Sequence, residues 1–178
     1  EMVNSALEAG IACKKPYFVE YRFHHADGSP HWVAERGRAV YSEQGEPLWL
    51  DGVIFDITGR KQAEEKLRES ETQYRELFNN ISSGVAIYEV RDDGNDFIFK
   101  DFNKAAERID GDRKEDVLGK SIFEVRPGIK EFGLLDVFNR VWKTGVSEHF
   151  SAQIYQDNRL FGWYENYVYK LPGGEIVT

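Results

Sequence analysis

A narrow apolar stripe in the middle of the chain is the feature that most restricts its fold. Between residues 59 and 81, apolar or small side chains recur at alternating steps of four and three residues: Ala63, Leu67, Ser70, Tyr74, Leu77 and Ile81. This heptad spacing is typical of a helix that meets a second helix along one seam. The intervening residues are polar, as on the wet faces of such a helix. We therefore predict a helix from residue 59 to 81 that joins two partner chains.

The strongest positions of the stripe are predicted to form the seam of a homodimer: Leu67, Tyr74, Leu77 and Ile81. Ala63 and Ser70 weaken this seam, because neither fills a knob position well. A helix of this length spans on the order of 30 Å. The alternative is that the stripe packs on a neighbouring sheet of its own chain.

The start of this helix carries two cations, Arg60 and Lys61, where the helix dipole favours anions. We expect Asp56 to compensate them by coupling to Arg60, and Thr58 to act as the N-cap. The alternative is that both cations are solvated and contribute almost nothing to stability.

Composition excludes several classes of protein. A net charge of -8 argues against binding to nucleic acid or to an anionic membrane, since both require a basic surface. No apolar run approaches the ~20 residues of a membrane span, and no signal peptide opens the chain. Its single cysteine, Cys13, excludes an internal disulfide. We expect a cytoplasmic segment of a longer protein.

Two β-rich segments flank the predicted helix. Alternating or β-prone residues predict three consecutive strands before it, at 17–24, 31–41 and 48–57, and four strands after it, at 85–91, 97–102, 146–155 and 160–170. Between the second and third of the later strands, the pattern is helical. Asn103 is the expected N-cap of a short helix, residues 113–118 form another turn or two, and one longer helix runs from Gly128 to Gly145.

The two segments are weakly repeated. Strand, turn, Trp32, strand and Gly45-Glu46 in the first are matched by strand, turn, Trp163, strand and Gly174-Glu175 in the second. The first copy is expected to lack its beginning and the second its end.

These motifs together resemble the PAS domain family. The second copy carries Asn103-Lys-Ala-Ala-Glu-Arg-Ile109 and Arg113-Lys-Glu-Asp-Val-Leu-Gly-Lys120, which are similar to the helical stretch of that family. The first carries Gly28, Trp32, Gly45, Gly52 and Asp56-Ile-Thr-Gly-Arg-Lys61, similar to its C-terminal motif. The resemblance implies an α+β fold, with a five-stranded antiparallel sheet and helices on one face. It divides the chain into a partial PAS-like domain (1–58), a connecting coiled-coil helix (59–81) and a nearly complete PAS-like domain that lacks its last strand (82–178).

The resemblance also implies a function. Such tandem modules sense a small ligand or relay a conformational signal to an effector domain in the same polypeptide. That effector is most often a histidine kinase and less often a diguanylate cyclase. Asp56, Thr58 and Arg60 would then form the signalling junction between sheet and helix. The alternative from another class is a ligand-free scaffold for protein interaction or dimerisation, and an acidic metal-dependent hydrolase ranks third.

Catalytic and metal-binding residues are not predicted. The sequence has no nucleophile with a matching base, no phosphate-binding loop and no zinc-ligand spacing. His24, His25 and His31 surround one turn, where solvated histidines are more common than metal ligands. We therefore expect no enzyme activity in this segment.

No cofactor is predicted either. Haem-binding relatives supply a histidine from the long helix and flavin-binding relatives a cysteine near the short helices, but residues 128–145 contain no His and residues 103–127 no Cys. A small-molecule ligand of unknown identity remains open. Six aromatic residues either line a cavity or belong to a plain core: Phe138, Trp142, Phe150, Tyr155, Trp163 and Tyr167.

Overall fold

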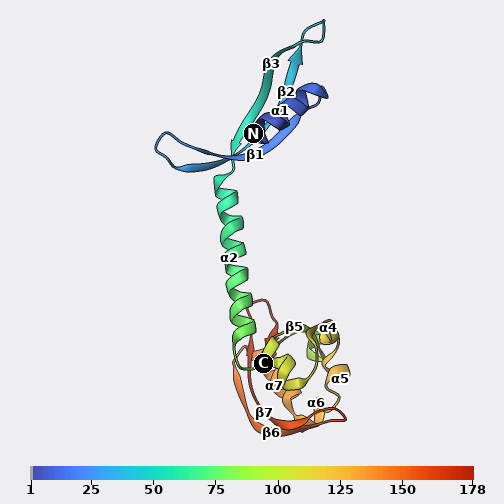
Figure 1. Ribbon diagram of the computed structural model, residues 1–178. Coiled ribbons are helices and arrows are strands. Elements are labelled where there is room, and N and C mark those ends of the chain that lie inside the picture. Colours follow the sequence, from blue (N-terminus) through green and yellow to red (C-terminus); the bar gives the residue numbers. More distant parts are fainter. Residues whose placement is uncertain (1) are drawn as a thin grey trace. The chain divides into compact units, whose positions relative to one another are not determined.

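The computed structural model describes residues 2–178, without the side chains of residues 2–4 and 6. The chain divides into two compact units, residues 1–72 and residues 73–178. Helix α2 (Thr58–Asn80) contributes to both units (Figure 1). It has nearly the bounds that the heptad spacing predicts.

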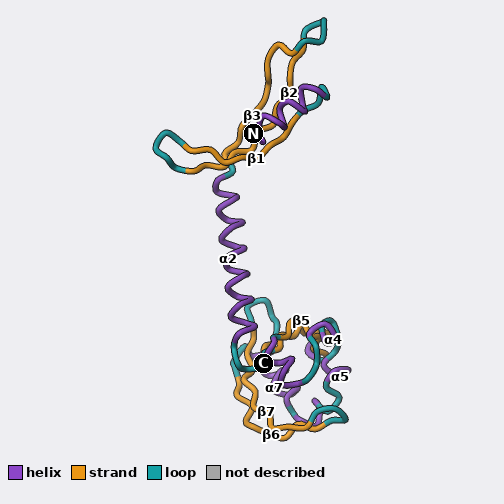
Figure 2. Tube along the Cα trace, in the orientation of Figure 1, coloured by secondary structure: helices purple, strands orange, loops and turns teal. Residues whose placement is uncertain are grey.

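The first unit is a three-stranded sheet with one covering helix. Its strands are β1 (Tyr17–His24), β2 (Pro30–Tyr41) and β3 (Pro47–Asp56), paired antiparallel in the order β1-β2-β3. Helix α1 (Met2–Ala12) contacts β1 and β2 (Figure 2). The predicted three-strand meander is therefore present.

Strand β3 lies at the edge of this sheet and is exposed along its whole length. Its apolar side chains are each about half exposed in this unit: Leu48, Trp49, Leu50, Val53, Ile54 and Phe55. An exposed edge strand with so many apolar side chains is unusual, because it invites pairing with other chains.

The second unit is an antiparallel five-stranded sheet with helices on one side. Its strands are β4 (Ala86–Arg91), β5 (Asp96–Phe102), β6 (Glu148–Gln156), β7 (Phe161–Lys170) and β8 (Ile176–Val177), in the order β5-β4-β8-β7-β6. A short 3-10 turn, η1 (Asp92–Gly94), connects β4 and β5. The helices are α3 (Lys104–Asp110), α4 (Lys114–Val117), α5 (Ile122–Val125), α6 (Ile129–Phe132) and α7 (Leu134–Thr144). In Figure 1, α4 to α7 lie to one side of β6 and β7.

The structure corrects two expectations for this unit and adds a helix that was not expected. The last strand is not missing, because the two residues of β8 pair with both β4 and β7 and complete the sheet. The helix predicted from 128 to 145 is two helices, since Gly133 has a φ of 85°, a left-handed conformation that ends α6. Helix α5 was not predicted, although Ser121 and Glu124 form a capping box at its start.

The core of the second unit lies between the sheet and α7. Phe138 is fully buried and meets the rings of Tyr88 and Phe97, with centroids 5.2 and 5.0 Å away. Leu134, Val137 and Val141 lie at neighbouring turns of α7 and are buried with it. Their spacing places one apolar face of the helix on the sheet.

No helix of residues 2–178 combines the length and the apolar character that a membrane crossing needs.

Candidate functional site

A cavity of about 560 Å³ opens inside the second unit. Its walls come from the segment before β4, from strands β4, β5, β6 and β7, and from helices α3, α5, α6 and α7. The apolar part of the lining includes Ala86, Phe102, Ala106, Ile109, Ile122, Ile129, Phe132 and Leu134. The volume lies within the ~300–1,000 Å³ of typical small-molecule sites.

A buried amide stands in the cavity wall without a partner. Asn166 lies on β7, two residues from both Tyr164 and Val168, so the three side chains share the face of the strand that turns to the core. Among the described residues, Asn166 Nδ2 is the buried side-chain polar atom for which the structure provides no hydrogen bond. Such orphan donors are rare and costly, and each calls for an explanation.

A network of ion pairs lies beside the cavity and contributes Arg126 and Asp110 to its lining. The Arg126 side chain is 8% exposed and donates to Asp110 Oδ2 at 2.7 Å and to Asp112 Oδ2 at 2.6 Å. Asp112 Oδ1 also accepts from Arg159, in the turn between β6 and β7, at 2.6 Å. The network therefore joins the loop after α3, the end of α5 and the β6–β7 turn.

Three tyrosine hydroxyls of the cavity remain protonated at neutral pH. Burial raises the pKa of the Tyr88, Tyr155 and Tyr164 hydroxyls above the ordinary value. Tyr155 donates to Asp157 Oδ2 at 2.6 Å. Burial alone would raise the pKa of Asp157, but this hydrogen bond and those from two backbone amides lower it below its usual range. Asp157 is therefore a carboxylate at neutral pH.

The six aromatic residues proposed as pocket candidates fall into three groups. Tyr155 belongs to the cavity lining and is buried. Trp163 and Tyr167 also belong to the lining, but they are 71% and 63% exposed and lie on the face of β7 that turns away from the core. Phe138 is a core residue, and Phe150 packs on the core through Phe132, with ring centroids 5.1 Å apart. Trp142 also packs on the core and has the Lys170 ammonium near its ring. Phe138, Trp142 and Phe150 are therefore not part of the lining.

Asn103 connects the wall of the cavity to the last turn of α2. Its side chain accepts from the Ala106 amide, as an N-cap does, and from the Val85 amide. The same side chain donates to the carbonyls of Phe78 and Ser83, at 2.9 and 3.0 Å. The sequence predicts the cap, but the bond to Phe78 needs the three-dimensional fold. Because Val85 and Ala106 line the cavity, Asn103 joins that wall directly to the helix.

At the start of α2, Arg60 and Lys61 pair with a carboxylate that the sequence does not predict. Glu20 of β1 accepts from Arg60 at 2.6 Å and from Lys61 at 2.7 Å. The expected pair of Asp56 with Arg60 is not formed. The sheet and the helix are coupled through β1 instead, because antiparallel pairing brings Glu20 beside this turn.

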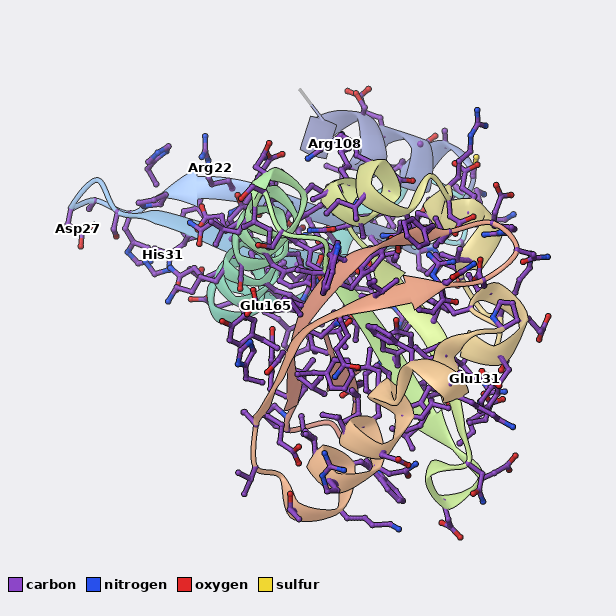
Figure 3. All side chains as sticks on the ribbon, turned by 90° about the horizontal axis from the view of Figure 1, so that it is seen from below. Arg22, Asp27, His31, Arg108, Glu131 and Glu165 are labelled. Carbon is purple, nitrogen blue, oxygen red and sulfur yellow. The ribbon has the colours of Figure 1, made fainter. Side chains whose placement is uncertain are left out.

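Asp56 has other partners. Its Oδ1 accepts the Thr58 amide at 2.8 Å, and its Oδ2 lies 3.2 Å from His31 Nδ1. The Thr58 hydroxyl accepts the Trp32 amide at 2.9 Å, so Thr58 joins the helix to β2 and Asp56 takes the capping role expected of Thr58. Figure 3 labels His31 on the strand after the hairpin tip at Asp27.

These contacts predict an acid titration of Asp56. Hydrogen bonds from Thr58 and then from His31 lower its pKa from 3.8 to about 2. A depressed folded-state pKa stabilises the junction above pH 3.8, and this contribution is lost as the pH falls toward 2. A carboxyl carbon NMR titration should find a midpoint near 2 that Thr58→Pro, which removes both Thr58 donors, returns toward 3.8. A wild-type midpoint near 3.8 would contradict this assignment.

The four predicted seam residues are exposed in their respective units. Leu67 is 62% exposed in the first unit and Leu77 is 69% exposed in the second, where Tyr74 and Ile81 are also exposed. Tyr74 stacks on Phe78, which is buried. The seam itself stays a prediction.

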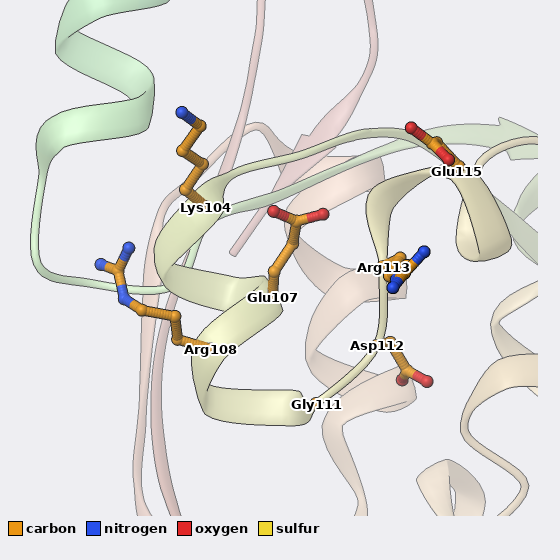
Figure 4. Close-up of a pocket in the computed structure, with 7 residues that line it drawn as sticks. All are labelled: Lys104, Glu107, Arg108, Gly111, Asp112, Arg113 and Glu115. Carbon is orange, nitrogen blue, oxygen red and sulfur yellow. The ribbon is translucent and has the colours of Figure 1, made fainter.

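A second hollow, of about 480 Å³, lies on the surface around α3 (Figure 4). Its lining carries three cationic and three anionic side chains together with one glycine: Lys104, Glu107, Arg108, Gly111, Asp112, Arg113 and Glu115. This balance of charge favours no ligand class. Among residues 2–178, no three His, Cys, Asp or Glu side chains gather at metal-binding distance.

Comparisons with known proteins support the two-copy architecture. Residues 1–54 match the family model of the PAS fold, and residues 72–142 match that of the PAS domain. No sequence among the curated proteins matches the chain.

Solved structures include similar chains. A sensory box histidine kinase/response regulator from Burkholderia thailandensis is 38% identical over 43% of this chain and 58% of that chain, with a TM-score of 0.39. A domain of a sensory box sensor histidine kinase/response regulator from Geobacter sulfurreducens is 19% identical over 62% of this chain and 92% of that one, with a TM-score of 0.49. The PAS domain of a GGDEF family protein from Chromobacterium violaceum is 28% identical over 32% of this chain and 53% of that one, with a TM-score of 0.25. On the two family matches, together with the five-stranded sheet and its helices, the chain belongs to the PAS domain family.

Proposed function

We propose that the second PAS domain senses a small molecule in its cavity and that α2 couples this domain to the rest of a signalling protein. The observation that carries the proposal is the side chain of Asn103. It is fully buried, and its four hydrogen bonds join the last turn of α2 to two backbone amides of the cavity wall. A ligand that moves this wall therefore acts on the helix end through a buried, fully satisfied polar contact.

A histidine kinase is the proposed effector, because the family places such modules before this output most often. A diguanylate cyclase is the alternative effector. PAS sensory domains are themselves non-catalytic, so any turnover would belong to the effector. Because a histidine kinase consumes ATP, we propose that the segment lies in the cytoplasm.

A ligand-free dimerisation scaffold is the second candidate function. The observation that favours it is the exposure of the stripe on α2, at Leu67 and Leu77 above all. We propose in either case that two copies of the chain pair through this helix. The domains would then be residues 1–58, the connecting helix 59–81 and residues 82–178, with Asp56, Thr58 and Arg60 in the signalling junction.

We further propose that the first unit is the C-terminal part of a PAS domain whose remaining strands pair with β3. In the second unit, β8 is the third strand of the meander and lies between β7 and β4. β3 is the third strand of the matching meander, yet it has β2 as its one strand partner among the described residues. A strand equivalent to β4 would cover that edge.

A change in the phase of α2 tests the relay. Inserting one alanine after Ser70 in the intact protein rotates the following residues by about 100°, whereas inserting seven residues nearly restores the phase. We expect the single insertion to lock effector activity in one state, and the seven-residue insertion to regain regulation. Autophosphorylation of the intact protein measures this for a kinase.

As the control, one alanine is inserted in the Gly45–Glu46 turn between β2 and β3, because this insertion leaves α2 unchanged. Regulation that survives the single insertion in α2 would rule out a relay through the phase of the helix and favour the scaffold.

A further inference from the structure

The outward face of strand β7 is aromatic although it is exposed to solvent. Burial alternates along the strand, and the side chains that turn away from the core are Phe161, Trp163, Glu165, Tyr167 and Tyr169. Phe161, Trp163 and Tyr167 are 72%, 71% and 63% exposed. An antiparallel sheet with one face in water normally carries polar side chains on that face. The outward face of β7 therefore has the composition of a covered surface.

Strand β6 extends this aromatic face. Ile154 lies opposite Trp163, and His149 lies opposite Tyr167, so these side chains share the outward face of the sheet. The His149 ring stacks on that of Tyr167, with centroids 4.5 Å apart and planes inclined by 16°. We define the outer patch as the exposed apolar residues of this face: Ile154, Phe161, Trp163, Tyr167 and Tyr169.

The charged side chain within the outer patch has a partner. Of the five outward residues of β7, Glu165 is the one with a charge, and its carboxylate lies 2.6 Å from His149 Nε2 on β6. The net charge of -8 opposes contact between two copies of the protein unless the meeting surfaces are themselves nearly uncharged. The outer patch meets this condition. The same net charge disfavours nucleic acid or an anionic membrane as the occupant.

The outer patch is large enough for a specific contact between two copies. An aromatic side chain buries ~150–250 Å² when it is covered completely. The exposed fractions of its four rings therefore correspond to on the order of 500 Å² per copy. Exposed apolar patches of this size mark interaction surfaces. Two such patches in contact would bury about 1,000 Å², the lower limit of a specific interface.

The spacing of the rings suits the same face of a second sheet. Trp163 and Tyr167 are four residues apart, which is about 13 Å along a strand. A partner ring midway between them would lie ~6.5 Å from both, within the range of aromatic pairs. The Glu165 carboxylate between them turns to His149 on β6. Sheets that pack face to face interdigitate their side chains in this manner.

The outer patch also adjoins the end of α2. Burial, and then the neighbouring Asp101 and Tyr169, raise the pKa of the Tyr74 hydroxyl. Tyr169 belongs to the outer patch, so the apolar stripe of α2 and the patch meet within the second unit. One dimer can bury both surfaces, and the helix then adds to the ~1,000 Å² of the patch toward the ~1,600 Å² of a standard interface.

We infer that the outer patch is a docking surface for the same patch of a second copy, and that two copies pair sheet to sheet through β6 and β7. A twofold axis presents the identical surface on both sides of such a contact. This interface is additional to the helix seam proposed above, and either one can fail without the other.

Fluorine NMR of the protein of residues 1–178 labelled with 5-fluorotryptophan tests which surface is covered. The chain has four tryptophans: Trp32, Trp49, Trp142 and Trp163. The Trp163 signal, assigned with Trp163→Phe, should shift over a dilution series that converts dimer into monomer. Trp142 of α7 packs on the core, so its signal is the internal control and should not shift.

Two results of this experiment would overturn the inference. The first is a dimer whose formation leaves the Trp163 signal unchanged, because the patch would then be uncovered. The second is a protein that stays monomeric at millimolar concentration, which would leave the patch to a partner other than a second copy.

Trp163→Arg tests the contribution of the patch to affinity. The dissociation constant should rise at least about tenfold, because the guanidinium would lose its hydration between two apolar surfaces. Leu118→Arg is the matched control, since Leu118 is also an exposed apolar residue but ends α4. This control should leave the dissociation constant unchanged. If Trp163→Arg does not fold, Tyr167→Arg must give the same rise.

The variants separate this inference from the helix seam. If Leu67→Asp combined with Leu77→Asp weakens the dimer and a folded Trp163→Arg variant does not, two copies pair through α2 alone and the inference is wrong. If Trp163→Arg weakens the dimer and the double leucine variant does not, the sheet face is the interface and the seam is wrong.

Discussion

Leu67→Asp combined with Leu77→Asp should convert a dimer of this protein into a folded monomer. Both side chains are mostly exposed within their own units, so the substitutions remove no intramolecular core contact. A dimer seam, by contrast, would bury both leucines, and a carboxylate there would lose its hydration without a partner. We expect the dissociation constant to rise by at least about a hundredfold.

Light scattering across a dilution series measures this change, and circular dichroism checks the fold. The matched control is Gln62→Asp combined with Thr72→Asp, which adds the same charge at exposed positions of α2 outside the apolar stripe. This control should remain dimeric. A dimer that persists in the double leucine variant would place the interface elsewhere, and an unfolded variant would mean that the stripe packs on its own domain.

The strands and α2 could be predicted from the sequence because their patterns are local. β1 begins and ends where its alternation does, at Tyr17 and His24, and Asn103 caps α3 as its residue type suggests. The split of the long helix was missed, because Gly133 takes a left-handed conformation that apolar spacing does not reveal. A glycine within a predicted helix was the available signal.

The site was harder to predict because a cavity is a tertiary property. The spacing of aromatic residues shows that they share one face of a strand or helix, but it does not show which face lines a cavity. Phe138 therefore lies in the core and outside the cavity lining, whereas Trp163 belongs to the lining although it is mostly exposed. Asn166 and Arg126 were not singled out. Asn166 stands out because its buried Nδ2 has no hydrogen-bond partner. Arg126 stands out because it pairs with Asp110 and Asp112, which are distant in sequence.

The junction shows the same limit for electrostatics. The sequence correctly indicates that Arg60 needs an anion, but Asp56 is near in sequence and Glu20 is near in space. The strand pairing of β1 with β2 decides between them, and this pairing is not visible in local spacing.

Arg126→Met should destabilise the second PAS domain by about 3–5 kcal/mol, the usual cost of removing one partner of a buried ion pair. The substitution leaves the carboxylates of Asp110 and Asp112 nearly buried without the guanidinium that both contact. Arg159→Met is the matched control, because Arg159 also lies 2.6 Å from Asp112 but is 50% exposed. An exposed pair contributes within about 1 kcal/mol, so burial alone should separate the two variants.

Hydrogen exchange of α7 and β4 across a urea series measures the stability of this domain separately from the first unit. Adding Asp110→Asn and Asp112→Asn to Arg126→Met should recover most of the loss, because the stranded charges are then removed with their partner. If Arg126→Met lowers the free energy of unfolding no more than Arg159→Met does, the ion pairs of Arg126 are as well solvated as the exposed pair of Arg159. If the triple variant is as unstable as Arg126→Met, the loss comes from the packing of the arginine stem and not from charge.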